Sequence, residues 1–129
     1  FLSLAKNPTG FNQNLSVVFE DDTEKDLIIA INDNAQDGAD VSWLWDVDFD
    51  RLAAKQIRSI TASGIRAQDM RLRLKYTDIP SMLEENIKTA IEKRLQDGCG
   101  NLYVLVNYTA LDPTRRALMQ MAEQKEGEA

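Results

Sequence analysis

Apolar residues recur along the chain in two alternating patterns. Short stretches dense in apolar residues, such as Leu-Tyr-Val-Leu-Val at 102–106, are typical of strands buried on both faces of a parallel sheet. Between them, apolar residues return every three or four positions, which is typical of helices that cover a sheet. The strands predicted in this way are 2–5, 25–31, 56–62 and 102–106.

The amphipathic stretches predict five helices. Asn7 or Thr9 is available to cap the first, and Ser81 with Glu84 three residues later forms a capping-box pattern for the fourth. Because strands and helices alternate, we expect right-handed β–α–β units and a mainly parallel sheet, that is, an α/β fold. The predicted helices are 11–19, 49–55, 66–74, 82–95 and 111–122.

One segment, between residues 31 and 50, concentrates unusual chemistry. It holds both tryptophans of the chain, Trp43 and Trp45, and six of its thirteen aspartates. The segment follows a predicted strand directly, which places it at the carboxyl edge of the sheet, where parallel sheets bind their ligands. We therefore expect the function here. The six aspartates are Asp33, Asp37, Asp40, Asp46, Asp48 and Asp50.

Simpler interpretations account for part of this segment. As an EF-hand loop that begins at Asp33, it would place Ala35 and Leu44 where calcium ligands are required, so we expect no metal site. Asp37–Gly38 also fits a plain turn, with Asp33 as a cap. In an extended chain the side chains of the two tryptophans would point to the same side. They would then either cover a site or pack in the hydrophobic core.

Other polar residues follow strands or turns. Gly64 stands at a strand-to-helix junction with Arg66 in the first helical turn, an arrangement that suits a phosphate or carboxylate. Arg66 equally suits an ion pair with a nearby aspartate that braces the loop. Lys6 and Asn7 precede a helix and either touch an anion or turn the chain. Cys99 lies in a glycine-rich turn without a base, so we expect it to be structural.

Composition narrows the classes of function. The 129 residues suffice for one domain. The net charge of −6 argues against nucleic-acid binding, and no apolar run approaches the roughly 20 residues of a transmembrane segment. The abrupt apolar start suggests a domain cut from a longer protein. The chain has no histidine, so for Cys-His-Asp or Ser-His-Asp chemistry it can only contribute a carboxylate to a site that another chain completes.

Three blocks of sequence resemble one family. They are Lys-Asn-Pro-Thr-Gly-Phe-Asn at 6–12, Asp-Asn-Ala-Gln-Asp-Gly-Ala-Asp-Val-Ser-Trp-Leu-Trp-Asp at 33–46 and Ser-Gly-Ile-Arg-Ala-Gln-Asp-Met-Arg-Leu-Arg-Leu-Lys-Tyr at 63–76. In this order they are similar to the C-terminal domain of MurT, the Mur-ligase-like subunit of lipid II isoglutaminyl synthase. The resemblance implies a Rossmann-like, three-layer domain of the Mur ligase C-terminal type that spans residues 1–129.

The resemblance also implies a two-subunit enzyme. MurT uses ATP and Mg²⁺ to activate the α-carboxyl of D-glutamate in the lipid II stem peptide, and its partner, the glutaminase GatD, supplies ammonia. ATP binding rests mainly on a central domain that, like a zinc ribbon, is missing from this chain, so we expect no cofactor in it. The enzyme is expected in the cytoplasm, acting at the inner face of the membrane.

In that family, an aspartate of this domain completes the cysteine–histidine site of GatD. We expect Asp37 to have this role, because it precedes a glycine in the middle of the loop. Asp40 and Asp33 are the alternatives. A different function for the same segment is a non-catalytic docking module, in which the acidic and aromatic residues only bind a partner.

The remaining residues of these blocks are expected to assist. Lys6 and Asn7 align with a loop that faces the nucleotide in Mur ligases, although that family's longer motif is reduced here to Lys-Asn-Pro. The residues expected to support the acidic loop are Trp43, Trp45, Asp46 and Arg66.

Overall fold

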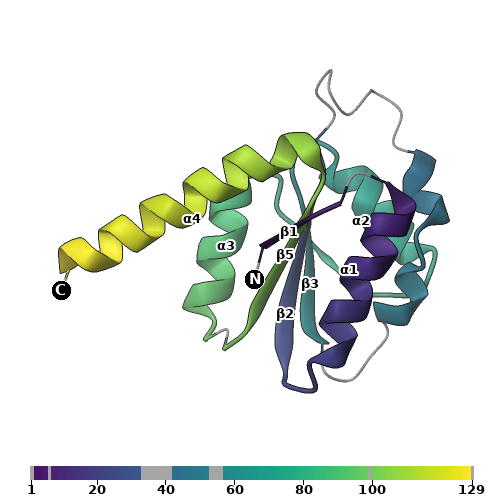
Figure 1. Cartoon of the computed structure of the whole chain (residues 1–129), viewed down its shortest axis with the longest axis horizontal. Coiled ribbons are helices and arrows are strands. Elements are labelled where there is room, and N and C mark those ends of the chain that lie inside the picture. The colour runs from purple at the N-terminus through teal and green to yellow at the C-terminus, as the bar shows by residue number, and fades with distance from the viewer. Residues whose placement is uncertain (1, 6, 33–41, 53–56, 99, 129) are drawn as a thin grey trace.

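Five parallel strands form one sheet at the centre of the molecule, in the order β1-β5-β2-β3-β4. The predicted α/β class and Rossmann-like parallel sheet are therefore confirmed. The computed structural model describes residues 2–5, 7–32, 42–52, 57–98 and 100–128 (Figure 1). The strands are β1 (Leu2–Leu4), β2 (Lys25–Ala30), β3 (Ile57–Ser63), β4 (Met82–Leu83) and β5 (Leu102–Val106).

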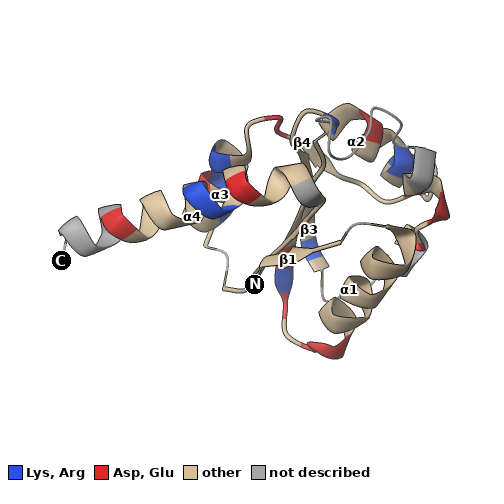
Figure 2. Cartoon of the chain, turned by 45° about the horizontal axis from the view of Figure 1, so that its top comes forward, with Lys and Arg blue, Asp and Glu red and all other residues tan. Residues whose placement is uncertain are grey.

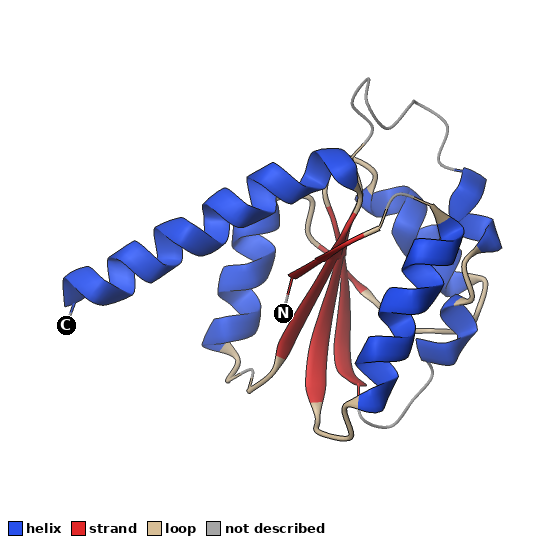
Figure 3. Cartoon of the chain, viewed as in Figure 1, coloured by secondary structure: helices blue, strands red, loops and turns tan. Residues whose placement is uncertain are grey.

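Helices cover both faces of the sheet, which makes three layers (Figure 3). One face carries α1 (Pro8–Glu20), α2 (Ala67–Lys75) and two short 3₁₀ helices, η1 (Ser42–Asp46) and η2 (Phe49–Leu52). The other face carries α3 (Ile87–Gln96) and α4 (Tyr108–Glu128).

Strand β2 lies in the middle of the core. Leu27 and Ile29 pack against α1 and α2, whereas Ile28 and Ala30 pack against α3 and α4, and all four are fully buried. This explains why the sequence shows a continuous apolar run here rather than an alternating one. Burial of each large aliphatic side chain stabilises the fold by about 1.5–3 kcal/mol.

The predicted helix over 82–95 is wrong at its beginning. Met82–Leu83 forms the edge strand β4, and Glu84 N–H donates to the carbonyl of Ala62 at 3.0 Å. The helix begins only at Ile87, after Asn86, whose side chain accepts a hydrogen bond from the N–H of Thr89 at 3.0 Å. Pairing with β3 thus outweighed the local capping-box pattern.

Other predicted elements keep their type and change their limits. The first helix begins at Pro8 with Asn7 as its cap, and the last runs from Tyr108 to Glu128. Of the predicted helix 49–55, η2 covers Phe49–Leu52, and residues 53–56 lie outside the described part. Both tryptophans lie in η1, so the extended conformation considered for them is wrong.

Charged side chains are spread unevenly over the helices (Figure 2). Helix α1 carries no Lys or Arg and a single carboxylate, Glu20, whereas α2 carries three cations and one carboxylate, Asp69. Helix α3 has the same balance as α2, with three cations and one carboxylate, Glu92, in a chain of net charge −6. In the part of the chain that the structure describes, no helix is both long and apolar enough to cross a bilayer.

Candidate functional site

The predicted edge of the sheet is a topological switch point. Strands β2 and β5 are hydrogen-bonded neighbours, but the chain leaves β2 towards the face of α1 and α2 and leaves β5 towards the face of α3 and α4. Neighbouring strands whose connections diverge in this way open a crevice beyond their carboxyl ends, where open α/β sheets bind ligands. The acidic segment follows β2 at this edge of the sheet.

Two buried asparagines fix the point where the segment begins. Asn32 N–H donates to Asn107 Oδ1 at 3.0 Å, and Asn107 Nδ2 donates back to the carbonyl of Asn32 at 2.6 Å. The Asn32 side chain donates to the carbonyl of Thr109 at 3.3 Å and accepts from the N–H of Ile65 at 2.9 Å. These bonds join the ends of β2, β3 and β5, so the chain enters residues 33–41 from a rigid base.

Gly64 lets the end of β3 approach the end of β2. Its φ of +88° lies in the left-handed region, and a Cβ at this position would lie 2.5 Å from the carbonyl oxygen of Ile31 and 2.8 Å from Asn32 Oδ1. Only glycine accepts this conformation and this contact together. The predicted tight junction between strand and helix is therefore correct.

Arg73 holds the far end of the segment. Its side chain is buried, with Nε donating to the carbonyl of Leu44 at 2.9 Å and a terminal nitrogen donating to that of Val47 at 2.7 Å. Its guanidinium also lies 5.1 Å from the ring centroid of Trp45 and 5.2 Å from that of Phe49. A helix on the sheet thus anchors η1, the element that follows residues 33–41.

Arg73 is not among the predicted site residues, although its place in the sequence carries a signal. Arg73 lies three residues after Met70 and next to Leu74, both of which are fully buried against the sheet. A cation on the apolar face of an amphipathic helix is buried, so it must find hydrogen-bond acceptors inside the protein. For Arg73 these acceptors are backbone carbonyls.

Trp45 is not a core residue. Its side chain is 49% exposed, and its ring packs edge-to-face on Tyr76, with centroids 5.2 Å apart. Trp45 thus contacts Arg73 and Tyr76 and leaves the rest of its indole in solvent, and its role in support of the acidic loop stays a prediction. Asp46 is exposed.

Of the other predicted site residues, the structure describes the side chains of Arg66 and Asn7. Arg66 pairs with Asp69 of its own helix at 3.3 Å, and its roles toward an anion or a loop aspartate stay predictions. Asn7 caps α1 by accepting from the N–H of Gly10 at 2.8 Å, in line with the simple turn. The catalytic candidates Asp33, Asp37 and Asp40, together with Lys6 and the side chain of Trp43, lie outside the described residues.

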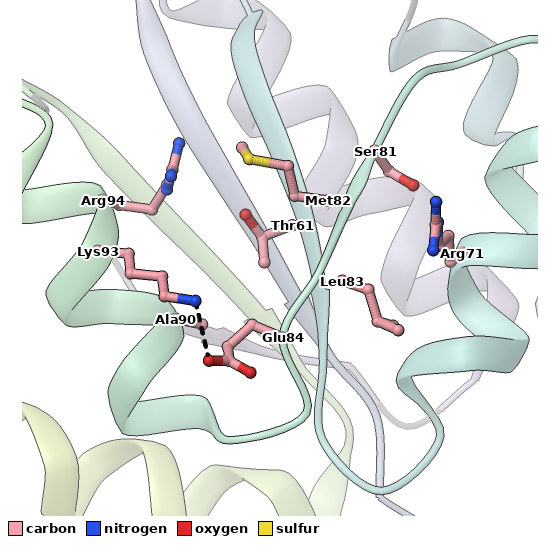
Figure 4. Close-up of a pocket in the computed structure, with 9 residues that line it drawn as sticks. All are labelled: Thr61, Arg71, Ser81, Met82, Leu83, Glu84, Ala90, Lys93 and Arg94. Atoms are coloured by element: carbon pink, nitrogen blue, oxygen red, sulfur yellow. Dashed lines mark hydrogen bonds and ion pairs between the residues drawn. The ribbon is translucent and has the colours of Figure 1, made fainter.

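A hollow of about 430 Å³ lies elsewhere, where β4 meets α2 and α3. Figure 4 shows Lys93 and Arg94 on one side of it and Arg71 on the other. Lys93 binds Glu84 at 3.2 Å, and Arg94 binds Asp97 at 2.8 Å. Because these two cations are already paired, the hollow offers a weaker argument for a site than the carboxyl edge. Across the described ranges, no group of three or more metal-binding side chains is found.

The chain matches one protein family over most of its length. The family is described as MurT ligase C-terminal, and the match covers residues 4–111. Over 124 residues the chain is 40% identical to "Lipid II isoglutaminyl synthase (glutamine-hydrolyzing) subunit MurT" of Staphylococcus aureus strain N315, which covers 95% of this chain and 28% of the relative. The protein of the same name from Streptococcus pneumoniae is 36% identical, covering 91% of this chain and 27% of the relative. The chain thus spans little more than a quarter of these curated relatives.

Proposed function

The chain belongs to the family of MurT ligase C-terminal domains, and from this premise we propose that it is the C-terminal domain of the ligase subunit of a lipid II isoglutaminyl synthase. The whole enzyme would amidate the α-carboxyl of D-glutamate in the stem peptide of lipid II, using ATP and ammonia released from glutamine. It would act at the cytoplasmic face of the membrane. The single observation that carries the proposal is the segment 33–46, whose sequence carries the resemblance and which lies between the Asn32–Asn107 pair at the switch point and the Arg73–Leu44 hydrogen bond on α2.

Within that enzyme, this domain would bind the glutaminase subunit GatD and lend it a carboxylate. In cysteine–histidine catalysis the thiolate attacks the carboxamide carbon of glutamine, and the imidazole gives a proton to the departing ammonia. A carboxylate that accepts the second N–H of the imidazole holds the ring in the required tautomer and orientation. Asp37 is the proposed donor, with Asp40 and Asp33 as alternatives.

ATP, Mg²⁺ and the zinc ribbon would belong to other parts of the full-length subunit. The proposal also draws on the sequence, which has no Walker-type phosphate loop. The contribution of this domain is therefore expected to be binding and orientation of the glutaminase.

The described residues that flank residues 33–41 support a catalytic role. A group that orients an imidazole must be held to within a fraction of an ångström. The Asn32–Asn107 pair fixes the residue before this stretch, and Arg73 fixes Leu44 and Val47 after it. A docking module needs no such precision. The exposed indole of Trp45 is the observation that favours the docking alternative, in which the segment only binds the partner.

Substitution of the aspartates distinguishes a catalytic role of the segment from a docking role. In the complex of the full-length ligase subunit with its glutaminase, Asp37→Asn should lower the turnover of glutamine hydrolysis by about 10²- to 10⁴-fold and leave the dissociation constant unchanged. Asp22→Asn, at the opposite end of the sheet, is the control and should have no effect on either. Full activity of Asp37→Asn would disprove the assignment to Asp37. A matching loss in Asp40→Asn or Asp33→Asn would move it to that residue.

A further inference from the structure

Three large apolar or aromatic side chains form an exposed surface beside the anchored segment. Trp45 of η1 is 49% exposed, and on α2 Leu72 and the capping residue Tyr76 are 46% and 70% exposed. Trp45 packs on Tyr76, and Leu72 lies one helical turn before Tyr76 on the same face of α2. We call Trp45, Leu72 and Tyr76 the aromatic surface. Grouped apolar side chains that remain in solvent mark interaction sites more often than isolated ones do.

This surface is held in place before any partner arrives. The indole of Trp45 rests on the guanidinium of Arg73, which is itself fixed by the carbonyls of Leu44 and Val47. An aromatic side chain that is already immobile loses little conformational entropy on binding, so its buried area contributes to affinity almost in full. Tryptophan and tyrosine in such a setting are the residues that dominate the binding energy of protein interfaces.

The charges around the aromatic surface indicate the chemistry of the partner. Arg71 and Lys75 are exposed and flank Leu72 and Tyr76 along α2. They form a basic border on the α2 side of the surface, whereas exposed Asp46 follows Trp45 on η1 and exposed Asp78 follows the end of α2. A matching partner would present an apolar pocket with carboxylates on the part of its rim that faces Arg71 and Lys75, because such a pair of surfaces attracts across the interface.

The position of the surface identifies the occupant. Trp45 lies in the first element after residues 33–41, and α2 carries the arginine that anchors this element. A partner that receives Asp37 must cover the chain next to it. We infer that the aromatic surface, with Arg71 and Lys75 at its border, is the principal docking surface for the glutaminase subunit. The inference rests on the proposed function and goes beyond it by naming the anchor residues.

Alanine substitutions in the full-length ligase subunit test this inference. Trp45→Ala and Tyr76→Ala should each weaken binding of the purified glutaminase by about 30-fold, the loss expected for an interface hot spot. Met119→Ala on α4 and Leu95→Ala on α3 are matched controls, because these side chains are 57% and 50% exposed on the opposite face of the sheet.

The charged border gives a second, independent measurement. Arg71→Glu and Lys75→Glu should slow association with the glutaminase about 10-fold at low salt, and the difference should shrink as salt is raised. Arg116→Glu on α4 serves as the control. Both α2 residues are exposed, so these variants should fold normally.

The possible outcomes separate this inference from the proposed function. If wild-type subunits form no complex, the proposed function fails and the inference with it. If they bind but Trp45→Ala and Tyr76→Ala bind as tightly as the controls, only the inference fails. Self-association of the ligase subunit that Trp45→Ala abolishes would also overturn it, since the surface would then serve a second copy of the chain.

Discussion

The two ends of the parallel sheet are both held by polar side chains, but with different chemistry. At the amino end the anchors are carboxylates that accept hydrogen bonds from an arginine and a tyrosine. Buried Asp26 accepts hydrogen bonds from Nε and a terminal nitrogen of Arg58 at 3.1 and 2.5 Å, and Asp21 accepts from Tyr103 at 2.6 Å. At the carboxyl end the described anchors are the neutral Asn32–Asn107 pair and an arginine bound to carbonyl oxygens.

This difference assigns the polar groups at the amino end of the sheet to stability and those at the carboxyl end to function. At the amino end, carboxylates serve as acceptors inside the fold. At the carboxyl end, amides, a glycine and backbone groups fix the acidic segment without the use of a carboxylate among the described residues. The proposed function requires that carboxylates of the segment be available to another protein.

The largest effect is expected at Gly64. Gly64→Ala would force a Cβ against the carbonyl oxygen of Ile31 at a positive φ, which should cost about 3 kcal/mol of unfolding free energy and displace the segment. Gly98→Ala has a similar φ of +81° and no atom within 4 Å of the new Cβ, so it should cost only about 1 kcal/mol. Urea unfolding measures both. Equal losses would show that close approach of β3 to β2 is unimportant.

Asp26 should matter for stability alone. Asp26→Asn keeps the shape of the side chain but removes the negative charge that faces Arg58. Because the Asp26 side chain is buried, this should lower the free energy of unfolding by about 2 kcal/mol. Asp97→Asn removes a largely exposed partner of Arg94 and should cost less than about 0.5 kcal/mol. Thermal unfolding of the domain tests the difference. A selective loss of glutaminase turnover in the folded Asp26→Asn complex would contradict the separation of the two ends.

Substitution of Arg73 tests the comparison between the two ends of the sheet at the carboxyl end. Arg73→Lys should lose the paired hydrogen bonds to the carbonyls of Leu44 and Val47. The loss should misplace Asp37 and lower glutaminase turnover about 10-fold. In an Asp37→Asn background the same change should have little further effect, because the two residues act as one unit. Arg71→Lys, on the exposed face of the same helix, is the control. A tenfold loss in both backgrounds would mean that Arg73 does not act through Asp37.

The smallest effect is a pH dependence at the amino end. Hydrogen bonds from the hydroxyls of Thr23 and Tyr103 lower the pKa of Asp21 to about 2, and the Asp21 carboxylate raises the pKa of Tyr103. A lowered carboxyl pKa adds stability above its ordinary value near 4, and this is lost as pH falls from about 4 to about 2. Asp21→Asn should flatten the unfolding free energy over this range in urea titrations at successive pH values. An unchanged slope would exclude this role of Asp21.

Sequence patterns predicted the framework of the molecule because hydrophobic periodicity dominates in buried elements. The apolar runs at 25–31 and 102–106 became neighbouring central strands, and the residues after them meet at the predicted edge. The edge strand Met82–Leu83 was missed because two residues carry no periodicity, and only pairing with β3 makes them a strand. Arg73 was missed because the carbonyls that it binds are distant in sequence and belong to an irregular turn.

The central claim is that Asp37 of this domain orients the catalytic histidine of the glutaminase. Titration of that histidine, followed by NMR with isotope-labelled histidine in the full complex, tests the claim directly. A carboxylate hydrogen-bonded to an imidazole stabilises its charged form, so Asp37→Asn should lower the pKa of the histidine by about 1. The same pKa in wild type and Asp37→Asn, with the complex intact, would contradict the claim.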